Sequence, residues 1–193
     1  MLLITHPAIS LGGTILVLGD SLSAGYGLQN PSLGWVGLLQ EKLKTVGKSH
    51  TLINASISGD TSAGGLARVD ALLTEHKPVV LILELGANDG LRGLVPANMQ
   101  ANLGEIMNRA QRSGVQLLLL GIRIPPNYGP RYNQLFEAVF PALAKQFGAA
   151  YVPFLLDGVG GHSELMQADG LHPNQQAQLI LMNNVWAKLL PLL

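Results

Sequence analysis

The sequence predicts a three-layer α/β/α sandwich built around a five-stranded parallel sheet. Two observations carry this prediction: short runs of residues that are apolar throughout, and segments with helical spacing that alternate with them along the chain. A strand covered by helices on both faces needs an uninterrupted apolar run, whereas a half-exposed strand alternates apolar and polar residues. Right-handed crossovers between such strands build an open parallel sheet with helices on both faces.

Five short runs of apolar and β-branched residues are the predicted strands. They cover residues 14–18, 51–54, 79–85, 115–122 and 150–152. The longest apolar stretches are far shorter than the roughly 18 residues that a membrane-spanning helix needs. We therefore expect buried strands and no transmembrane segment.

Apolar residues at helical spacing follow each predicted strand. The five stripes are Leu39, Leu43 and Val46; Leu66, Val69, Leu72 and Leu73; Met99, Leu103, Ile106, Met107 and Ala110; Leu135, Val139 and Leu143; and Ala177, Ile180, Leu181, Val185 and Leu189. Gly114 is expected at the C′ position of the third helix, where a left-handed backbone favours glycine. Pro141 is expected to kink or break the fourth helix, because proline lacks the N–H that a helix interior needs.

The composition fits one well-buried domain over residues 1–193. Hydrophobic residues make up 48% of the chain and charged residues only 12%, so a large core is available and disorder is not expected. Twelve basic residues balance 12 acidic ones, with no basic stripe that could neutralise phosphates. Nucleic acid is therefore not an expected partner. The sequence leaves the oligomeric state open.

The cellular compartment is also left open. The chain has no cysteine, which excludes a disulfide framework, thiol catalysis and cysteine metal sites but identifies no compartment. Residues 1–13 contain no Lys or Arg and are interrupted by Pro7, so they lack the charged start of a secretory signal. Either the protein stays inside the cell or this is a mature chain whose signal has been removed.

Candidate chemistry is expected directly after the strands, because ligands of open parallel sheets bind outside the carboxyl ends of the strands. Ser21 follows the first strand, in the segment Gly19-Asp20-Ser21. Gly59 follows the second and could leave its backbone N–H free to donate. Asn88 follows the third and could supply a fixed, neutral donor. Each residue type also has an ordinary role as a helix cap or a turn former.

A carboxylate and a histidine lie three residues apart before the last predicted helix. On one turn, Asp169 can reach the imidazole Nδ1 of His172 and so leave Nε2 available as a base. In isolation this pair is more simply explained as ordinary polar residues at a helix start, with Pro173 near the first helical position. Together, the four segments contain a nucleophile, a base, an orienting carboxylate and oxyanion donors, which are the parts that acyl transfer needs.

These four segments, in this order, resemble the SGNH (GDSL-type) hydrolase family, which is named for its Ser, Gly, Asn and His. The resemblance spans Gly19 to Pro173, and the segments at 123–129 and 154–159 look like the bacterial thioesterase/arylesterase/lysophospholipase subgroup. It implies a flavodoxin-like SGNH hydrolase fold and slightly favours a periplasmic or secreted mature chain. The G-x-S-x-G elbow of α/β-hydrolases is absent around Ser21, which disfavours that other class of serine hydrolase.

The resemblance implies a role for each matching residue. Ser21 would attack an acyl carbonyl, His172 would take the serine proton, and Asp169 would hold His172 in place. The backbone N–H groups of Ser21 and Gly59, with the side-chain amide of Asn88, would form the oxyanion hole. The implied activity is a serine esterase of the arylesterase, carboxylesterase or acyl-thioesterase type.

The expected substrate is a small-molecule ester with an uncharged or acyl-chain group. The candidates are carboxylic esters of short to medium acyl or aryl type, with thioesters and lysophospholipids as further candidates. Two loops would give the site apolar walls, as small-ligand pockets usually have. The expected wall residues are Ile124, Pro125, Pro126, Phe154, Leu155, Leu156, Val159, Leu165 and Met166. Each of them could instead only pack its loop onto the core.

Two alternatives stay open at this point. One is a carbohydrate-ester deacetylase that uses the same machinery. The other belongs to a different class, a non-catalytic α/β binding module that retains the fold, in which Ser21 would be unreactive toward a fluorophosphonate probe.

Other polar residues are assigned structural roles. Glu84 is expected to be a buried, hydrogen-bonded carboxylate, while Asp20 and Asp89 are expected to shape turns. No cofactor or metal is expected, because no phosphate-binding fingerprint is present and the other histidines lack metal-ligand spacing. These histidines are His6, His50, His76 and His162.

Overall fold

The computed structural model describes residues 12–193. Residues 1–11, which include His6 and most of the segment considered for a secretory signal, lie outside the described residues. The described chain forms one parallel sheet in the order β2-β1-β3-β4-β5, which is the flavodoxin-like, doubly wound order. The strands are β1 (Thr14–Gly19), β2 (Thr51–Asn54), β3 (Val80–Glu84), β4 (Gln116–Leu120) and β5 (Ala150–Val152). The predicted fold class is confirmed.

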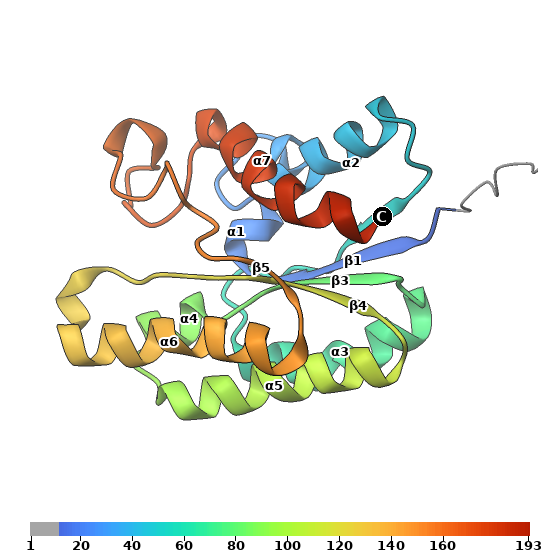
Figure 1. Cartoon of the computed structure of the whole chain (residues 1–193). Helices are drawn as coiled ribbons and strands as arrows, with labels where there is room; N and C mark the ends of the chain where they lie inside the picture. The colour runs from blue at the N-terminus through green and yellow to red at the C-terminus, as the bar shows by residue number, and fades with distance from the viewer. Residues whose placement is uncertain (1–11) are drawn as a thin grey trace, which may run out of the picture.

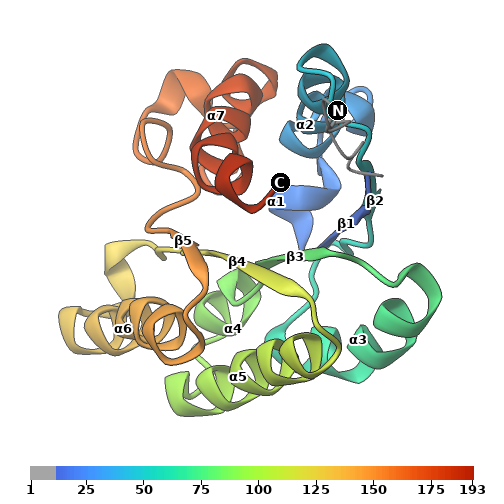
Figure 2. The same ribbon diagram turned by 45° about the vertical axis from the view of Figure 1, so that its right-hand side comes forward.

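Helices cover both faces of the sheet (Figures 1 and 2). One face carries α1 (Ser21–Ala24), α2 (Trp35–Thr45) and α7 (Gln178–Leu189). The other carries α3 (Ser62–His76), α4 (Ala87–Leu91), α5 (Pro96–Arg112) and α6 (Pro130–Phe147). Within residues 12–193, no helix combines the length and the apolar character needed to cross a membrane.

Burial follows the position of each strand in the sheet. The inner strands β1, β3 and β4 are almost wholly buried, whereas the edge strands β2 and β5 are partly exposed. Every predicted strand agrees with the structure to within two residues at each end. Strands β3 and β4 are shorter than predicted because the buried residues Leu85 and Ile122 continue the apolar run beyond the last ladder pair.

Most residues of the predicted helical stripes are buried in the core, while Leu66, Leu72 and Ile180 are only partly buried. All five predicted apolar residues of α5 are buried, and Gly114 adopts φ +77° directly after the C-cap of this helix, as expected. Val46 and Leu135, in contrast, are exposed. The prediction for Pro141 was wrong in part, because α6 continues without a break to Phe147. Pro141 is exposed, so water can reach the carbonyl whose helical donor is missing.

Two short helices were not predicted, and both position candidate site residues. Helix α1 begins at Ser21 directly after β1, and α4 contains Asn88 after β3. One turn of helix is too short to show an apolar period, so sequence spacing gives no signal for it. Strands β1 and β3 are neighbours at the point where the chain order reverses, which is the switch point where such sheets bind ligands.

Candidate active site

Ser21 and His172 meet at the carboxyl edge of the sheet, although they lie 151 positions apart in the chain. The Oγ atom of Ser21 is 2.8 Å from Nε2 of His172. Ser21 is the first residue of α1, and His172 lies in the loop that leads to α7. A hydroxyl within hydrogen-bonding reach of an imidazole nitrogen is the geometry of an activated nucleophile.

Asp169 holds the other side of the imidazole. Its Oδ2 lies 2.7 Å from Nδ1 of His172, and its Oδ1 accepts the backbone N–H groups of Leu171 and His172 at 2.9 and 3.0 Å. Desolvation acts in the opposite direction, but the hydrogen bonds from His172 and Leu171 lower the pKa of Asp169 to about 2. Because an ionised carboxylate only accepts, Nδ1 carries the proton and Nε2 is left to accept from Ser21.

Two residues that the sequence analysis missed fix the loop around His172. The ring of Tyr26 lies 4.6 Å from the imidazole, centroid to centroid, at an interplanar angle of 41°. Gln167 Nε2 donates to the carbonyls of Tyr26 and Pro173, at 2.8 and 3.0 Å. The Gln167 side chain therefore links the segment after α1 to the histidine loop.

Two residues that line the site have backbone N–H groups without a partner in the described part of the protein. Within residues 12–193, the N–H groups of Ser21 and Gly59 have no protein acceptor, and both residues line the same cavity. Gly59 has φ +82°, although a Cβ atom there would meet nothing within 4 Å. Glycine is required at this position for its backbone conformation and not for space.

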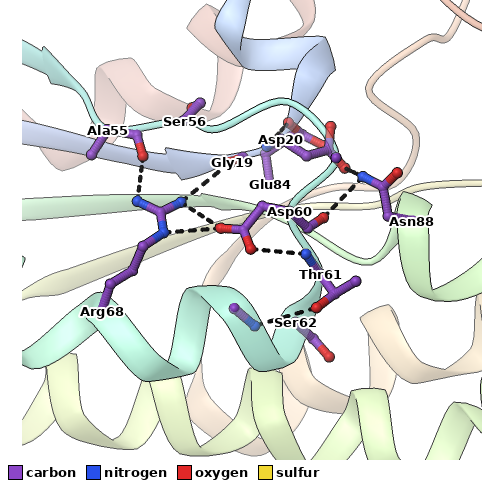
Figure 3. Close-up of polar contacts among 12 residues, drawn as sticks. Gly19, Asp20, Ala55, Ser56, Asp60, Thr61, Ser62, Arg68, Glu84 and Asn88 are labelled. Carbon is purple, nitrogen blue, oxygen red and sulfur yellow. Dashed lines mark hydrogen bonds and ion pairs between the residues drawn. The ribbon is translucent and has the colours of Figure 1, made fainter.

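Asn88 also faces the cavity, but its amide is already engaged. Its Nδ2 donates to the carbonyl of Asp60 at 2.9 Å and to Oδ2 of Asp20 at 3.1 Å (Figure 3). To donate to a substrate oxygen, Nδ2 of Asn88 would have to give up one of these two hydrogen bonds. The bond to Asp20 is the longer of the two, and the bond to Asp60 would then fix the amide plane.

Two buried carboxyl groups, Asp20 and Glu84, lie at the start of α1 next to Ser21. Asp20 caps α1 by accepting Leu22 N–H at 3.0 Å, and Glu84 Oε2 accepts Ser23 Oγ–H at 2.6 Å and Asp20 N–H at 3.2 Å. Burial raises the pKa of Asp20 to about 6. The pKa of Glu84 is raised well above its usual value, mainly by burial and secondly by the charge of Asp20. Glu84 is a buried, hydrogen-bonded carboxyl as expected, while Asp20 does more than shape a turn because it also holds Asn88.

Asp89 also differs from its expected role. It is buried, and its carboxylate accepts Ser62 N–H at 2.8 Å as well as the Ser62 hydroxyl. Ser62 is the first residue of α3, 27 positions away, so Asp89 joins two helices and does not serve a local turn. Sequence spacing could not show this contact, because it depends on how α3 and α4 pack.

A cavity of about 210 Å³ opens beside Ser21 and His172. Four predicted wall residues line it: Ile124, Pro125, Phe154 and Leu156. Further lining residues that the sequence analysis did not assign to the walls are Leu22, Tyr26, Ser58, Ala87, Leu91, Ile122, Arg123 and Leu171. The guanidinium of Arg123 lies over the ring of Phe154 at 4.8 Å, so the one charged wall residue is partly stacked on an aromatic wall residue.

The other five predicted wall residues do not line this cavity, which corrects the expectation. Leu155 and Val159 are fully buried in the core, and Leu165 and Met166 are partly buried against it. Pro126 is exposed and begins a short 3₁₀ helix, Pro126–Tyr128. Neighbouring side chains in a loop point in different directions, so an apolar residue next to a wall residue can belong to the core.

The described residues hold no cluster of three or more His, Asp or Glu side chains that could bind a metal ion. His162 lies 3.5 Å from Glu164, and both side chains are exposed. His50 is buried, and burial lowers the pKa of its imidazole.

The chain is similar to known proteins in both sequence and structure. Residues 17–180 match the model of the GDSL-like Lipase/Acylhydrolase family. Esterase TesA of Pseudomonas aeruginosa is 56% identical over 93% of this chain and 89% of its own length. The thioesterase 1/protease 1/lysophospholipase L1 of Escherichia coli K12 is 44% identical, over 93% of this chain and 84% of its own length.

Solved structures give the same relationship. The crystal structure of TesA superposes with a TM-score of 0.91 over 93% of this chain and 99% of that chain, at 56% identity. A psychrotrophic esterase, EstA from Pseudoalteromonas sp., solved in a form inhibited by monoethylphosphonate, gives a TM-score of 0.88 at 45% identity. That match covers 93% of this chain and 97% of EstA.

Proposed function

The chain belongs to the GDSL-like lipase/acylhydrolase family, and from this premise we propose that it hydrolyses carboxylic esters through an acyl-enzyme on Ser21. Membership of this family makes the chain an ester-hydrolysing enzyme. The observation that carries the assignment of Ser21 is its 2.8 Å hydrogen bond to His172, whose other nitrogen lies 2.7 Å from Asp169. A non-catalytic binding module would not need Ser21, His172 and Asp169 to form a hydrogen-bonded chain beside a cavity.

The proposed reaction has two half-reactions. In the first, Ser21 Oγ forms a bond to the acyl carbon while its proton passes to Nε2 of His172. The tetrahedral intermediate then collapses, and the leaving alcohol or thiol takes that proton. In the second, water attacks the acyl-enzyme, again with His172 as base, and releases the acid and Ser21. Asp169 stabilises the imidazolium that forms in each half-reaction.

The oxyanion of both intermediates would be held by three donors: the backbone N–H groups of Ser21 and Gly59 and the side-chain amide of Asn88. The unpaired backbone N–H groups at the cavity support the first two. The amide of Asn88 reaches the same cavity but exchanges its bond to Asp20 for the substrate oxygen. Such donors stabilise the transition state more than the ground state and therefore act on kcat.

Replacement of Asn88 by alanine should lower kcat by about 10²- to 10³-fold, the usual effect of losing one oxyanion donor. KM should change little, since the bond forms fully only in the transition state. The measurement is steady-state hydrolysis of a nitrophenyl ester, with circular dichroism to verify folding. Asn108→Ala is the matched control, because Asn108 lies on α5 and its amide donates to Glu105. Wild-type turnover of folded Asn88→Ala would rule out the oxyanion role of this side chain.

The proposed substrates are esters with short to medium acyl or aryl groups, and thioesters and lysophospholipids are further candidates. The apolar cavity walls support an acyl-chain site, since they offer few hydrogen-bond partners to the hydroxyl groups of a sugar. The relatives are named as an esterase, a thioesterase and lysophospholipase, and an arylesterase. Both observations disfavour the carbohydrate-ester deacetylase.

A series of nitrophenyl esters from acetate to palmitate should show kcat/KM rising with chain length and then levelling or falling once the cavity is filled. Each newly buried CH₂ contributes about 0.8 kcal/mol, or about fourfold in kcat/KM. A parallel series of acyl thioesters and lysophospholipids ranks the other candidates. A preference for acetylated sugars over every acyl ester would contradict the proposed substrate class while leaving the chemistry of Ser21 intact.

A further inference from the structure

The guanidinium group of Arg68 joins three segments that meet at the site (Figure 3). Arg68 lies on α3, and its Nε and Nη2 atoms lie 2.9 and 2.8 Å from Oδ2 of Asp60. Nη2 also donates to the carbonyl of Gly19 at 3.4 Å, and Nη1 donates to the carbonyl of Ala55. One side chain therefore contacts the end of β1, the residue after β2 and the turn that follows.

Each proposed oxyanion donor is tied closely to one of these acceptors. Gly19 precedes Ser21 by two residues. Asp60 directly follows Gly59, and the backbone carbonyl of Asp60 accepts the amide of Asn88 at 2.9 Å. All three donors are thus linked, directly or through a neighbouring residue, to groups that Arg68 contacts.

The surroundings of this ion pair are shaped to hold it. The side chains of Arg68 and Asp60 are only 21% and 11% exposed, so solvent screens the pair less than a surface pair. Asp60 Oδ1 accepts Thr61 N–H at 3.0 Å, and a Cβ atom on Gly64 would lie 1.8 Å from the same Oδ1. The glycine in the first turn of α3 therefore makes room for the Asp60 carboxylate.

The charge of Arg68 matters as well as its shape. The backbone carbonyl of Asp60 accepts the Asn88 amide, so the carboxylate of the same residue carries its negative charge one residue's width from a proposed oxyanion donor. An unpaired carboxylate there would oppose the negative charge that develops on the oxyanion. Arginine suits the position better than lysine, because its planar group can donate to several acceptors at once.

We propose that Arg68 is a positioning residue for ester hydrolysis: it pairs with Asp60 and thereby fixes Gly59 and Asn88 against the end of β1. This inference rests on the proposed function and adds to it a side chain that lies outside the cavity lining. Arg68 touches no substrate and acts through the oxyanion donors. Misplacing such donors by about 1 Å is enough to lower the rate by about 10²-fold.

Kinetics of Arg68→Met, Arg68→Lys and Asp60→Asn test the inference. Arg68→Met should lower kcat by about 10- to 100-fold and leave KM within about twofold, while Arg68→Lys, which keeps the charge, should recover part of the loss. Arg109→Met is the matched control, because Arg109 also bridges two carboxylates, Asp70 and Glu105, at 2.7 and 2.8 Å but lies away from the cavity. Its kcat should equal that of the wild type.

A double-variant cycle separates positioning from a general structural role. In the Asn88→Ala background, Arg68→Met should cost less than it does in the wild type, because one of the two donors that it positions is already gone and only the effect on Gly59 remains. Unchanged kcat in folded Arg68→Met, or losses from Arg68→Met and Asn88→Ala that multiply in full, would overturn the inference. If Arg68→Met fails to fold, Arg68→Lys and Asp60→Asn decide by the same criteria. Wild-type and Ser21→Ala activities, measured beside them, report separately on the proposed function.

Discussion

Ser21→Ala is expected to lower kcat for ester hydrolysis by about 10⁶-fold, the scale seen when a serine hydrolase loses its nucleophile. The hydroxyl of Ser21 is the group that lies 2.8 Å from the candidate base, and the alanine variant can form no acyl-enzyme. The free N–H groups at the site would leave a residual rate above that of water. Steady-state hydrolysis of a nitrophenyl ester, with detection down to the uncatalysed rate, measures the loss.

A second serine in the same cavity provides the control for this prediction. Ser58 also lines the cavity, but within the described chain the hydroxyl that is hydrogen-bonded to His172 belongs to Ser21. Ser58→Ala should therefore keep kcat within a few-fold of the wild type. A loss in Ser58→Ala as large as that in Ser21→Ala, or a Ser21→Ala variant that retains substantial turnover, would mean that the nucleophile lies elsewhere.

His172→Ala should cause a loss of similar size, because a serine hydroxyl without its base is a poor nucleophile. Since the two residues act as one unit, the double variant should be no slower than either single variant. His162→Ala is the matched control, because His162 is an exposed loop residue beside Glu164, and its kcat should stay near that of the wild type.

The additivity of the two losses is the informative outcome. If the losses from Ser21→Ala and His172→Ala multiplied in full, the two residues would act independently, and the shared proton transfer would be excluded. If His172→Ala alone kept most of its activity, another group would have to accept the serine proton.

Most of the fold could be predicted because its signals are local and repeated. Inner strands buried on both faces need mostly apolar residues, and these runs predict β1, β3 and β4 to within two residues at each end. Helix α5 was predicted for the same reason, since its five apolar positions recur at helical spacing. The short helices α1 and α4 were missed because a single turn shows no period.

The residues of the candidate site could be named from the sequence, but their contacts could not. The order of the four segments predicts Ser21, Gly59, Asn88 and His172 as site residues. It gave no indication that the amide of Asn88 is bonded to Asp20 and Asp60. The bond to Asp20 depends on the side-by-side placement of β1 and β3, and the bond to Asp60 depends on how the turn after β2 meets α4. Both are tertiary features.

The cavity walls show a second limit of sequence reasoning. Phe154 and Leu156 face the cavity, whereas Leu155 between them is buried in the core. All three are equally apolar, so composition cannot tell the two environments apart. Arg68 was missed for a related reason: an arginine on a helix is usually a solvated residue, and only the fold brings it to Asp60, Ala55 and Gly19.

The activation of Ser21 by His172 is tested most directly by the rate at which a fluorophosphonate labels the protein, with the modified peptide identified by mass spectrometry. We expect one adduct, on the peptide that contains Ser21, formed quickly in the wild type and slowed by several orders of magnitude in His172→Ala. An adduct on another residue, or labelling of Ser21 at the wild-type rate in the absence of His172, would contradict the proposed mechanism.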